Sequence, residues 1–148
     1  MSDSSQSVHL TQVSDYQFDI DFGIAGSSWR ADEPPPLGQG AGPSPVQLLA
    51  SAVGNCLSAS LLFALRKFKQ KPEPVSCRVE ALVGRNVEGL MRVRSLAATL
   101  TLGVPAEALQ YLDRVLATFE AYCTVTQSVS PAIPVSVTVV DALGVKLK

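Results

Sequence analysis

The stretch PSPVQLLASAVGNCLSASLLFALRKFKQ, residues 43–70, decides the fold of this chain. Ser44 is suited to cap a helix, and Pro45 suits the first helical position, where its missing N–H would be unpaired anyway. No residue from Val46 to Leu65 is charged, whereas basic residues gather just after it, at the negative end of the helix dipole. Pro72 ends the pattern. The sequence therefore predicts one helix of roughly 35–40 Å, at about 1.5 Å per residue, with apolar residues on every side.

An uncharged run of this length has to be weighed as a membrane span. Polar residues interrupt it and lower its hydropathy, among them Gln47, Asn55 and Ser58. The segments on both sides of it have the pattern of sheet strands. We therefore expect a helix buried in the core, or against a second copy of itself, and no membrane partner.

Composition limits the remaining possibilities. The chain has 148 residues and a net charge of −1, so neither a nucleic acid nor an anionic membrane is an obvious partner. We expect one domain over residues 1–148 with a disordered tail at 1–7. No basic region followed by an apolar one opens the chain, which favours a cytoplasmic location. Three cysteines without tight spacing and a single histidine argue against a disulfide framework or a metal site.

Alternating apolar and polar residues predict strands on both sides of the long helix. The expected strands cover residues 8–11, 16–22, 28–31, 75–83, 90–102 and 135–139. Within 90–102, Arg92 and Arg94 share parity with Leu96, so either a bulge resets the register or one end of the strand leaves the core. Strands and helices segregate along the chain, which predicts an α+β fold with largely antiparallel sheets around the long helix.

Two more helices and one long loop complete the prediction. An amphipathic helix starts at Pro105 and stops near Tyr122 and Cys123, with apolar residues at helical spacing up to Phe119. Thr124 and Gln127 have capping-box spacing and predict a short helix through Ser130. The glycines of the loop at residues 32–43 fit no dinucleotide fingerprint, and no phosphate-binding lysine accompanies them, so we expect no cofactor.

Two of the three cysteines are candidates for chemistry. Cys123 lies where a short helix begins, and unpaired N–H groups there would favour its thiolate. Cys56 has no such help from its own helix, so a reactive Cys56 needs a cation from elsewhere, for which Arg30 is the candidate. The alternative is that both are core residues. Cys77 shares strand parity with neighbouring valines and is expected to be a small buried hydrophobe.

The segment DEPPPLGQGAGPSPVQLLASAVGNCLSASLLFALRK resembles the osmotically inducible protein C / organic hydroperoxide resistance (OsmC/Ohr) family. Members of that family have a glycine-rich loop, a proline-containing start to the central helix, and the first cysteine on that helix. Their second cysteine stands in a Cys-Pro-Val-Ser-like motif, and Cys123-Thr124-Val125-Thr126 occupies that place here. The similarity extends from about Tyr16 to Val140.

The resemblance implies an intertwined homodimer with two long helices at its centre and active sites at the subunit interface. It also implies a thiol-dependent peroxidase of oxidative-stress defence. Cys56 would attack an organic hydroperoxide, Cys123 would form a disulfide with it, and an external dithiol would reduce the bridge. The chain departs from the family at Val46, where the characterised peroxidases carry a glutamate that orients the activating arginine. The alternative is therefore a non-enzymatic dimer that binds a small apolar or thiol ligand in the same interface pocket.

Overall fold

The computed structural model describes residues 2–148, and the chain divides into two compact units, residues 1–48 and 49–148. Of the predicted tail at 1–7, Met1 lies outside the described residues, and residues 2–8 carry no helix or strand. The expectation of one domain over the whole chain stays a prediction.

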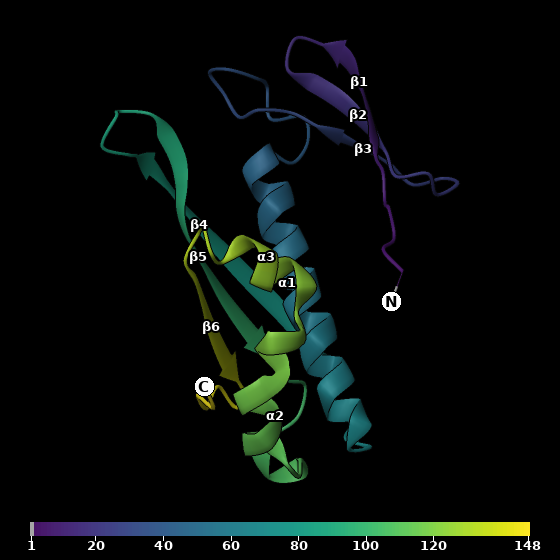
Figure 1. Ribbon diagram of the computed structural model, residues 1–148, viewed down its shortest axis with the longest axis vertical. Coiled ribbons are helices and arrows are strands. Elements are labelled where there is room, and N and C mark those ends of the chain that lie inside the picture. Colours follow the sequence, from purple (N-terminus) through teal and green to yellow (C-terminus); the bar gives the residue numbers. More distant parts are fainter. Residues whose placement is uncertain (1) are drawn as a thin grey trace. The chain divides into compact units, whose positions relative to one another are not determined.

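The first unit contains a three-stranded antiparallel sheet in the order β1-β2-β3 (Figure 1). These strands are β1 (His9–Ser14), β2 (Gln17–Asp21) and β3 (Ser28–Ala31). A strand was predicted near each of the three, on clean period-two alternation in the case of β2, and Ile20 is the buried side chain of β2.

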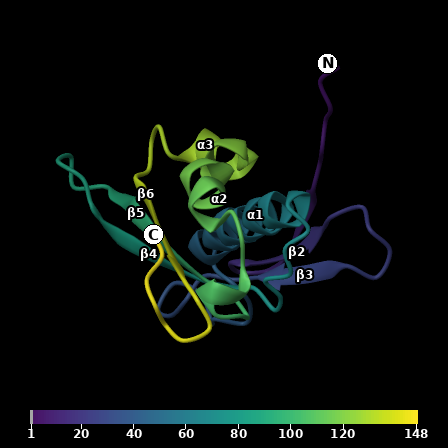
Figure 2. The same cartoon turned by 90° about the horizontal axis from the view of Figure 1, so that it is seen from below.

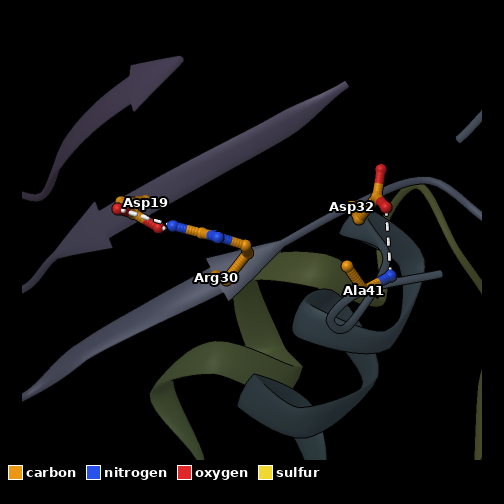
Figure 3. Close-up of polar contacts among 4 residues, drawn as sticks. All are labelled: Asp19, Arg30, Asp32 and Ala41. Carbon is orange, nitrogen blue, oxygen red and sulfur yellow. Dashed lines mark hydrogen bonds and ion pairs between the residues drawn. The ribbon is translucent and has the colours of Figure 1, made fainter. Parts of the chain in front are cut away.

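Asp32 fixes the glycine-rich loop that follows β3. Its Oδ2 atom accepts hydrogen bonds from the backbone N–H groups of Gln39 and Ala41, each at 3.0 Å, and Figure 3 shows the bond to Ala41. At Gly38 and Gly42, an added Cβ would collide with the backbone of Glu33 and Arg30, respectively. These glycines therefore allow the loop to fold closely on itself, which explains their density without a bound phosphate.

The long helix α1 (Pro45–Lys67) begins as predicted. The Ser44 N–H donates to Gln47 Oε1 at 2.9 Å, and the Gln47 N–H donates to Ser44 Oγ at 3.3 Å, which together form a capping box. Within the single chain only one stripe of α1 is buried, whereas Phe63 on another face is 66% exposed. The buried residues of the stripe are Ala50, Val53, Gly54, Leu57, Leu61 and Leu65. By length and composition alone α1 could cross a bilayer, a test that the core helices of soluble proteins also pass.

The second unit contains a three-stranded sheet in the order β4-β5-β6. Its strands are β4 (Ser76–Arg85), β5 (Met91–Thr101) and β6 (Val135–Val140). The pairing of β4 with β5 shifts where Leu82 faces Ser95 and Val83 faces Val93. Arg94 is thus the extra residue of a bulge. A bulge was one of the two explanations that we considered for Arg92 and Arg94 falling on the same side of the strand as Leu96.

Strand β6 is parallel to β5, because the chain crosses the unit through a helical segment before it returns to the sheet. That segment comprises η1 (Ala106–Ala108), α2 (Leu112–Thr118), η2 (Phe119–Tyr122) and α3 (Thr124–Val129). Every other strand pairing is antiparallel, so the predicted α+β fold with largely antiparallel sheets is confirmed.

The prediction of one continuous helix from Pro105 to near Tyr122 is wrong, because the segment divides into η1, α2 and η2. Tyr111 has a left-handed backbone with a φ of 61°, and its ring stacks on Phe68 at a centroid distance of 4.9 Å. The adjacent Gln110 N–H donates to the side chain of Gln70 at 2.8 Å rather than to a helical carbonyl. Contacts with Phe68 and Gln70, just after the end of α1, therefore divide the segment into η1 and α2.

The helices of the second unit lie on one side of its sheet (Figures 1 and 2). Alternate residues from Leu96 to Leu102, along β5 and directly after it, are at most 2% exposed and form the core with the buried stripe of α1. Val115, Leu116 and Phe119 of the α2–η2 segment join the same core. The packing of the α2–η2 segment on this core places the start of α3 beside the middle of α1.

Candidate thiol site

The fold brings Cys56 and Cys123 together from distant parts of the sequence. Cys56 is a half-buried residue near the middle of α1. Cys123 is fully buried between η2 and α3. The segment from α2 to α3 runs antiparallel to α1 (Figure 1), so α3 begins beside the middle of that helix. The side chain of Cys123 consequently lies close enough to Cys56 to raise the pKa of its thiol.

Cys123, rather than Thr124, is the N-cap residue of α3. Its thiol donates to the hydroxyl of Thr126 at 3.0 Å, and its carbonyl oxygen accepts from the Gln127 N–H at 2.9 Å. The short helix was predicted correctly, but its start lies one residue earlier than the capping-box spacing indicated, because the Gln127 side chain turns to the carbonyl of Glu120 instead.

The electrostatic environment of Cys56 favours the neutral thiol. Burial is the largest influence and raises the pKa of Cys56, and the neighbouring Cys123 side chain raises it further. The nearby backbone N–H groups of Val125 and Thr126 lower the pKa in part. The sum is a pKa above the ordinary value, so this unit by itself does not supply an activated thiolate.

A groove of about 470 Å³ opens beside Cys56, between α1 and the α2–η2 segment. Along α1 its wall follows helical spacing, with Cys56, Ala59, Ser60, Phe63, Ala64, Lys67 and Phe68. The opposite wall consists of Arg114, Val115, Thr118 and Tyr122. Cys56 is thus the thiol that a small molecule in this groove would meet, whereas Cys123 is shielded.

Arg30, the third predicted site residue, lies on β3 of the first unit. It faces Asp19 directly across the β2–β3 pairing, and Figure 3 shows its guanidinium on both carboxylate oxygens, at 2.9 and 3.2 Å. The guanidinium holds the pKa of Asp19 below its usual value. The role of Arg30 toward Cys56 stays a prediction.

Cys77 lies on β4, partly buried and packed against the core of the second unit. Its sulfur would lie 3.5 Å from a Cβ placed on Gly54, so the helix approaches this strand closely. Burial raises the pKa of Cys77. This environment agrees with the predicted structural role.

Sequence reasoning missed the groove and the N–H groups of Val125 and Thr126. The groove residues along α1 and directly after it recur at i, i+3, i+4, i+7, i+8, i+11 and i+12 from Cys56, so helical spacing from that cysteine was a signal that could have identified them. The N–H groups carried no such signal, because the start of α3 meets α1 only through tertiary packing. Within residues 2–148, no three side chains of His, Cys, Asp or Glu gather into a possible metal site.

A family model for OsmC-like proteins matches residues 38–138. That match covers most of the chain, including both cysteines of the site, and the chain belongs to the OsmC-like family. No curated protein matches it.

Several solved structures share the fold. An OsmC-like protein of unknown function from Vibrio cholerae superposes with a TM-score of 0.77 at 18% identity, covering 93% of this chain and 99% of that one. An organic hydroperoxide resistance protein from Legionella pneumophila has a TM-score of 0.68 at 16% identity, covering 94% and 98%. The organic hydroperoxide resistance protein OhrB of Bacillus subtilis has a TM-score of 0.69 at 11% identity, covering 92% and 98%. At these identities the likeness establishes the fold.

Proposed function

We propose that the protein is a thiol-dependent peroxidase that reduces organic hydroperoxides through Cys56 and Cys123. The observation that carries this proposal is the pairing of the two thiols, one on an open groove and the other buried behind it. That arrangement suits a cysteine that meets the substrate and a second one that resolves the product. Some structural neighbours are named organic hydroperoxide resistance proteins, which agrees with this chemistry.

The proposed reaction has three steps. The Cys56 thiolate attacks the terminal oxygen of R–O–OH, so that an S–O bond forms, the O–O bond breaks, and the alkoxide takes a proton to leave as an alcohol. The Cys123 sulfur then attacks the Cys56 sulfenic acid, which forms a disulfide and releases water. An external dithiol exchanges with this disulfide, is itself oxidised to a disulfide, and returns both cysteines to thiols.

Two further parts belong to the same proposal. Arg30, held by Asp19, supplies the positive charge that Cys56 lacks in its own unit. A second copy of the chain covers the exposed face of α1, since only 28% of the most apolar window of that helix is buried in one chain. Position 46 is a valine and has no carboxylate that could pair with an arginine. The carboxylate that pairs with Arg30 is that of Asp19.

The alternative is a dimer that binds a small apolar or thiol ligand without turnover. The raised pKa of Cys56 favours it, because a neutral thiol is a poor nucleophile. Counting free thiols after treatment with cumene hydroperoxide separates the two functions. The peroxidase loses two thiols per chain, Cys56→Ser loses none, and Cys77→Ala still loses two. If the folded wild-type protein keeps all three thiols, the peroxidase proposal is wrong and the binding function replaces it.

A further inference from the structure

Residues 146–148 pair with β6 as a short edge segment of the second sheet. Val139 accepts a hydrogen bond from the N–H of Leu147 at 2.8 Å and donates its own N–H to the carbonyl of Lys148 at 3.1 Å. Val140 forms an antiparallel bridge to the same segment. The edge segment ends beside α2 (Figure 1), and it brings the side chain of Lys148 to the α2–η2 segment.

The ammonium group of Lys148 anchors the α2–η2 segment at two points. Its Nζ atom donates to the carbonyl oxygen of Leu116 at 2.8 Å, near the C-terminal end of α2, where the helix dipole favours a cation. The same atom lies 2.6 Å from Glu120 Oε1, in an ion pair whose side chains are 34% and 28% exposed. Within residues 2–148 this ion pair is the only polar contact of the buried Oε1 atom.

Glu120 is also the residue that holds the start of α3. Its backbone carbonyl accepts hydrogen bonds from the Cys123 N–H and from the side chain of Gln127, each at 3.0 Å. Cys123 in turn lies close enough to Cys56 to raise the pKa of its thiol. A continuous series of contacts therefore leads from Lys148 through Glu120 to the two thiols.

The segment that carries Cys123 depends on such contacts, because its helices are short. There are seven residues in α2 and six in α3, and isolated helices shorter than about 12 residues are marginal in water. Leu116 and Phe119 bury their side chains in the core, but apolar burial is not directional. The bonds of Lys148 are directional, and they fix η2 in one position relative to the edge of the sheet.

We propose that Lys148 is a positioning residue for the Cys56–Cys123 pair. It holds η2 in place while both cysteines are thiols, so that little conformational freedom remains to be lost when the S–S bond forms. The anchor thereby raises the effective concentration of one thiol toward the other. For a disulfide formed through a Cys56 sulfenic acid, the inference rests on the proposed peroxidase function; for exchange with an external disulfide, it does not.

Equilibration of the full chain with reduced and oxidised glutathione measures this effective concentration. The two protein thiols are oxidised to a disulfide while one oxidised glutathione is reduced to two glutathione thiols, and peptide mapping gives the bridged fraction. We expect Lys148→Met, which keeps an unbranched side chain but removes the charge, to lower the effective concentration by about fivefold or more. Glu120→Gln, which leaves the backbone carbonyl in place, should lower it too. The matched control Lys146→Met, on the exposed part of the same edge segment, should not.

An effective concentration that is unchanged or higher in folded Lys148→Met overturns the proposal, as does a wild-type pair that forms no disulfide in the glutathione mixture. If Lys148→Met does not fold, Glu120→Gln decides by the same measurement. A contact that only stabilises the fold would lower the melting temperatures of the dithiol and disulfide forms equally. It would leave the glutathione equilibrium at the wild-type value.

The role of Lys148 in the peroxidase reaction is tested with cumene hydroperoxide in the presence of dimedone. Slower closure of the disulfide leaves the Cys56 sulfenic acid exposed for longer, so Lys148→Met should give more dimedone adduct than the wild-type protein or Lys146→Met. Equal adduct in all three proteins would overturn this role. If no hydroperoxide oxidises Cys56 while the glutathione equilibrium shifts as expected, the peroxidase function fails and the positioning of the pair by Lys148 stands.

Discussion

At the scale of single residues, the sulfur of Cys56 is subject to opposing influences. Burial and the Cys123 side chain favour its protonated form, and the N–H groups of Val125 and Thr126 oppose them only in part. A thiolate at neutral pH therefore requires a positive charge close to the sulfur. Arg30 stays charged at any physiological pH and is the residue we propose for this role.

Replacement of Arg30 by methionine tests this role. A cation beside a titrating group commonly lowers its pKa by about one to three, so Arg30→Met should slow the alkylation of Cys56 at pH 7 by about tenfold or more. The midpoint of the pH–rate profile should move upward, because without the cation more alkaline conditions are needed to ionise the thiol. Iodoacetamide labelling of Cys56 across pH 6–10 measures both effects. Arg92→Met is the control, and an identical profile for Arg30→Met and the wild-type protein would exclude Arg30.

The division of labour between the thiols gives a second prediction. Cys123→Ser cannot form a disulfide, so hydroperoxide should leave a sulfenic acid on Cys56 that dimedone captures. The serine hydroxyl can still donate to Thr126, which preserves the start of α3. Mass spectrometry of the labelled peptide checks the result. A folded variant without a dimedone adduct on Cys56 would contradict the assigned order of attack.

At the scale of elements, a single buried carboxylate connects three segments of the second unit. Asp141, 1% exposed at the end of β6, accepts hydrogen bonds from the N–H groups of Ala106, Leu143 and Val145. The bond to Ala106 ties η1 to the sheet, and the other two close the turn before the C-terminal residues. These bonds hold the pKa of Asp141 below its usual value.

Asp141 should therefore make the stability of the fold depend on pH. Its pKa is lower in the folded state, so its contribution is present above the ordinary aspartate pKa and is lost as the pH falls through the lowered value. Asp141→Asn should lower the melting temperature at pH 7 and reduce the further loss between pH 5 and pH 2. Thermal unfolding across this range measures it, with the exposed Asp113→Asn as control. Equal acid sensitivity in Asp141→Asn and the wild-type protein would be the contrary result.

The elements also show what the sequence could and could not predict. Strands and the long helix follow from local periodicity and capping, so β1 to β6 and α1 were predictable within a few residues. The break at Tyr111 was not, because stacking on Phe68, far away in sequence, overrides the helical pattern of the α2 segment. Cys56 and Cys123 could be proposed as a pair only through the family resemblance, since no local pattern brings α3 to the middle of α1.

At the scale of the whole molecule, the open question is what covers α1. The helix was predicted to be buried on most of its surface, yet in one chain it buries a single stripe. An apolar helix face of this kind is costly to leave in water. A symmetric pair of chains is the commonest way to cover such a face and is the assembly that we propose.

A charge on that face should separate the chains. Ala52 is exposed on α1 and does not line the groove, so Ala52→Glu should disrupt the pairing while each chain stays folded. Sedimentation equilibrium at micromolar concentration should give twice the chain mass for the wild-type protein and a shift toward one chain mass for the variant. Ala117→Glu, on the exposed side of α2, should behave as wild type. A wild-type monomer would refute the proposed dimer.

The central claim is that Cys56 and Cys123 form a redox pair, and the most direct test is peptide mapping after one equivalent of cumene hydroperoxide. Cys123 lies close enough to Cys56 to raise the pKa of its thiol, and a disulfide requires Cα atoms roughly 4.4–6.8 Å apart. We predict one disulfide-linked pair of peptides, containing Cys56 and Cys123 of the same chain, with Cys77 recovered as a free thiol. Recovery of all three cysteines as free thiols, or a bridge that includes Cys77, would contradict the account.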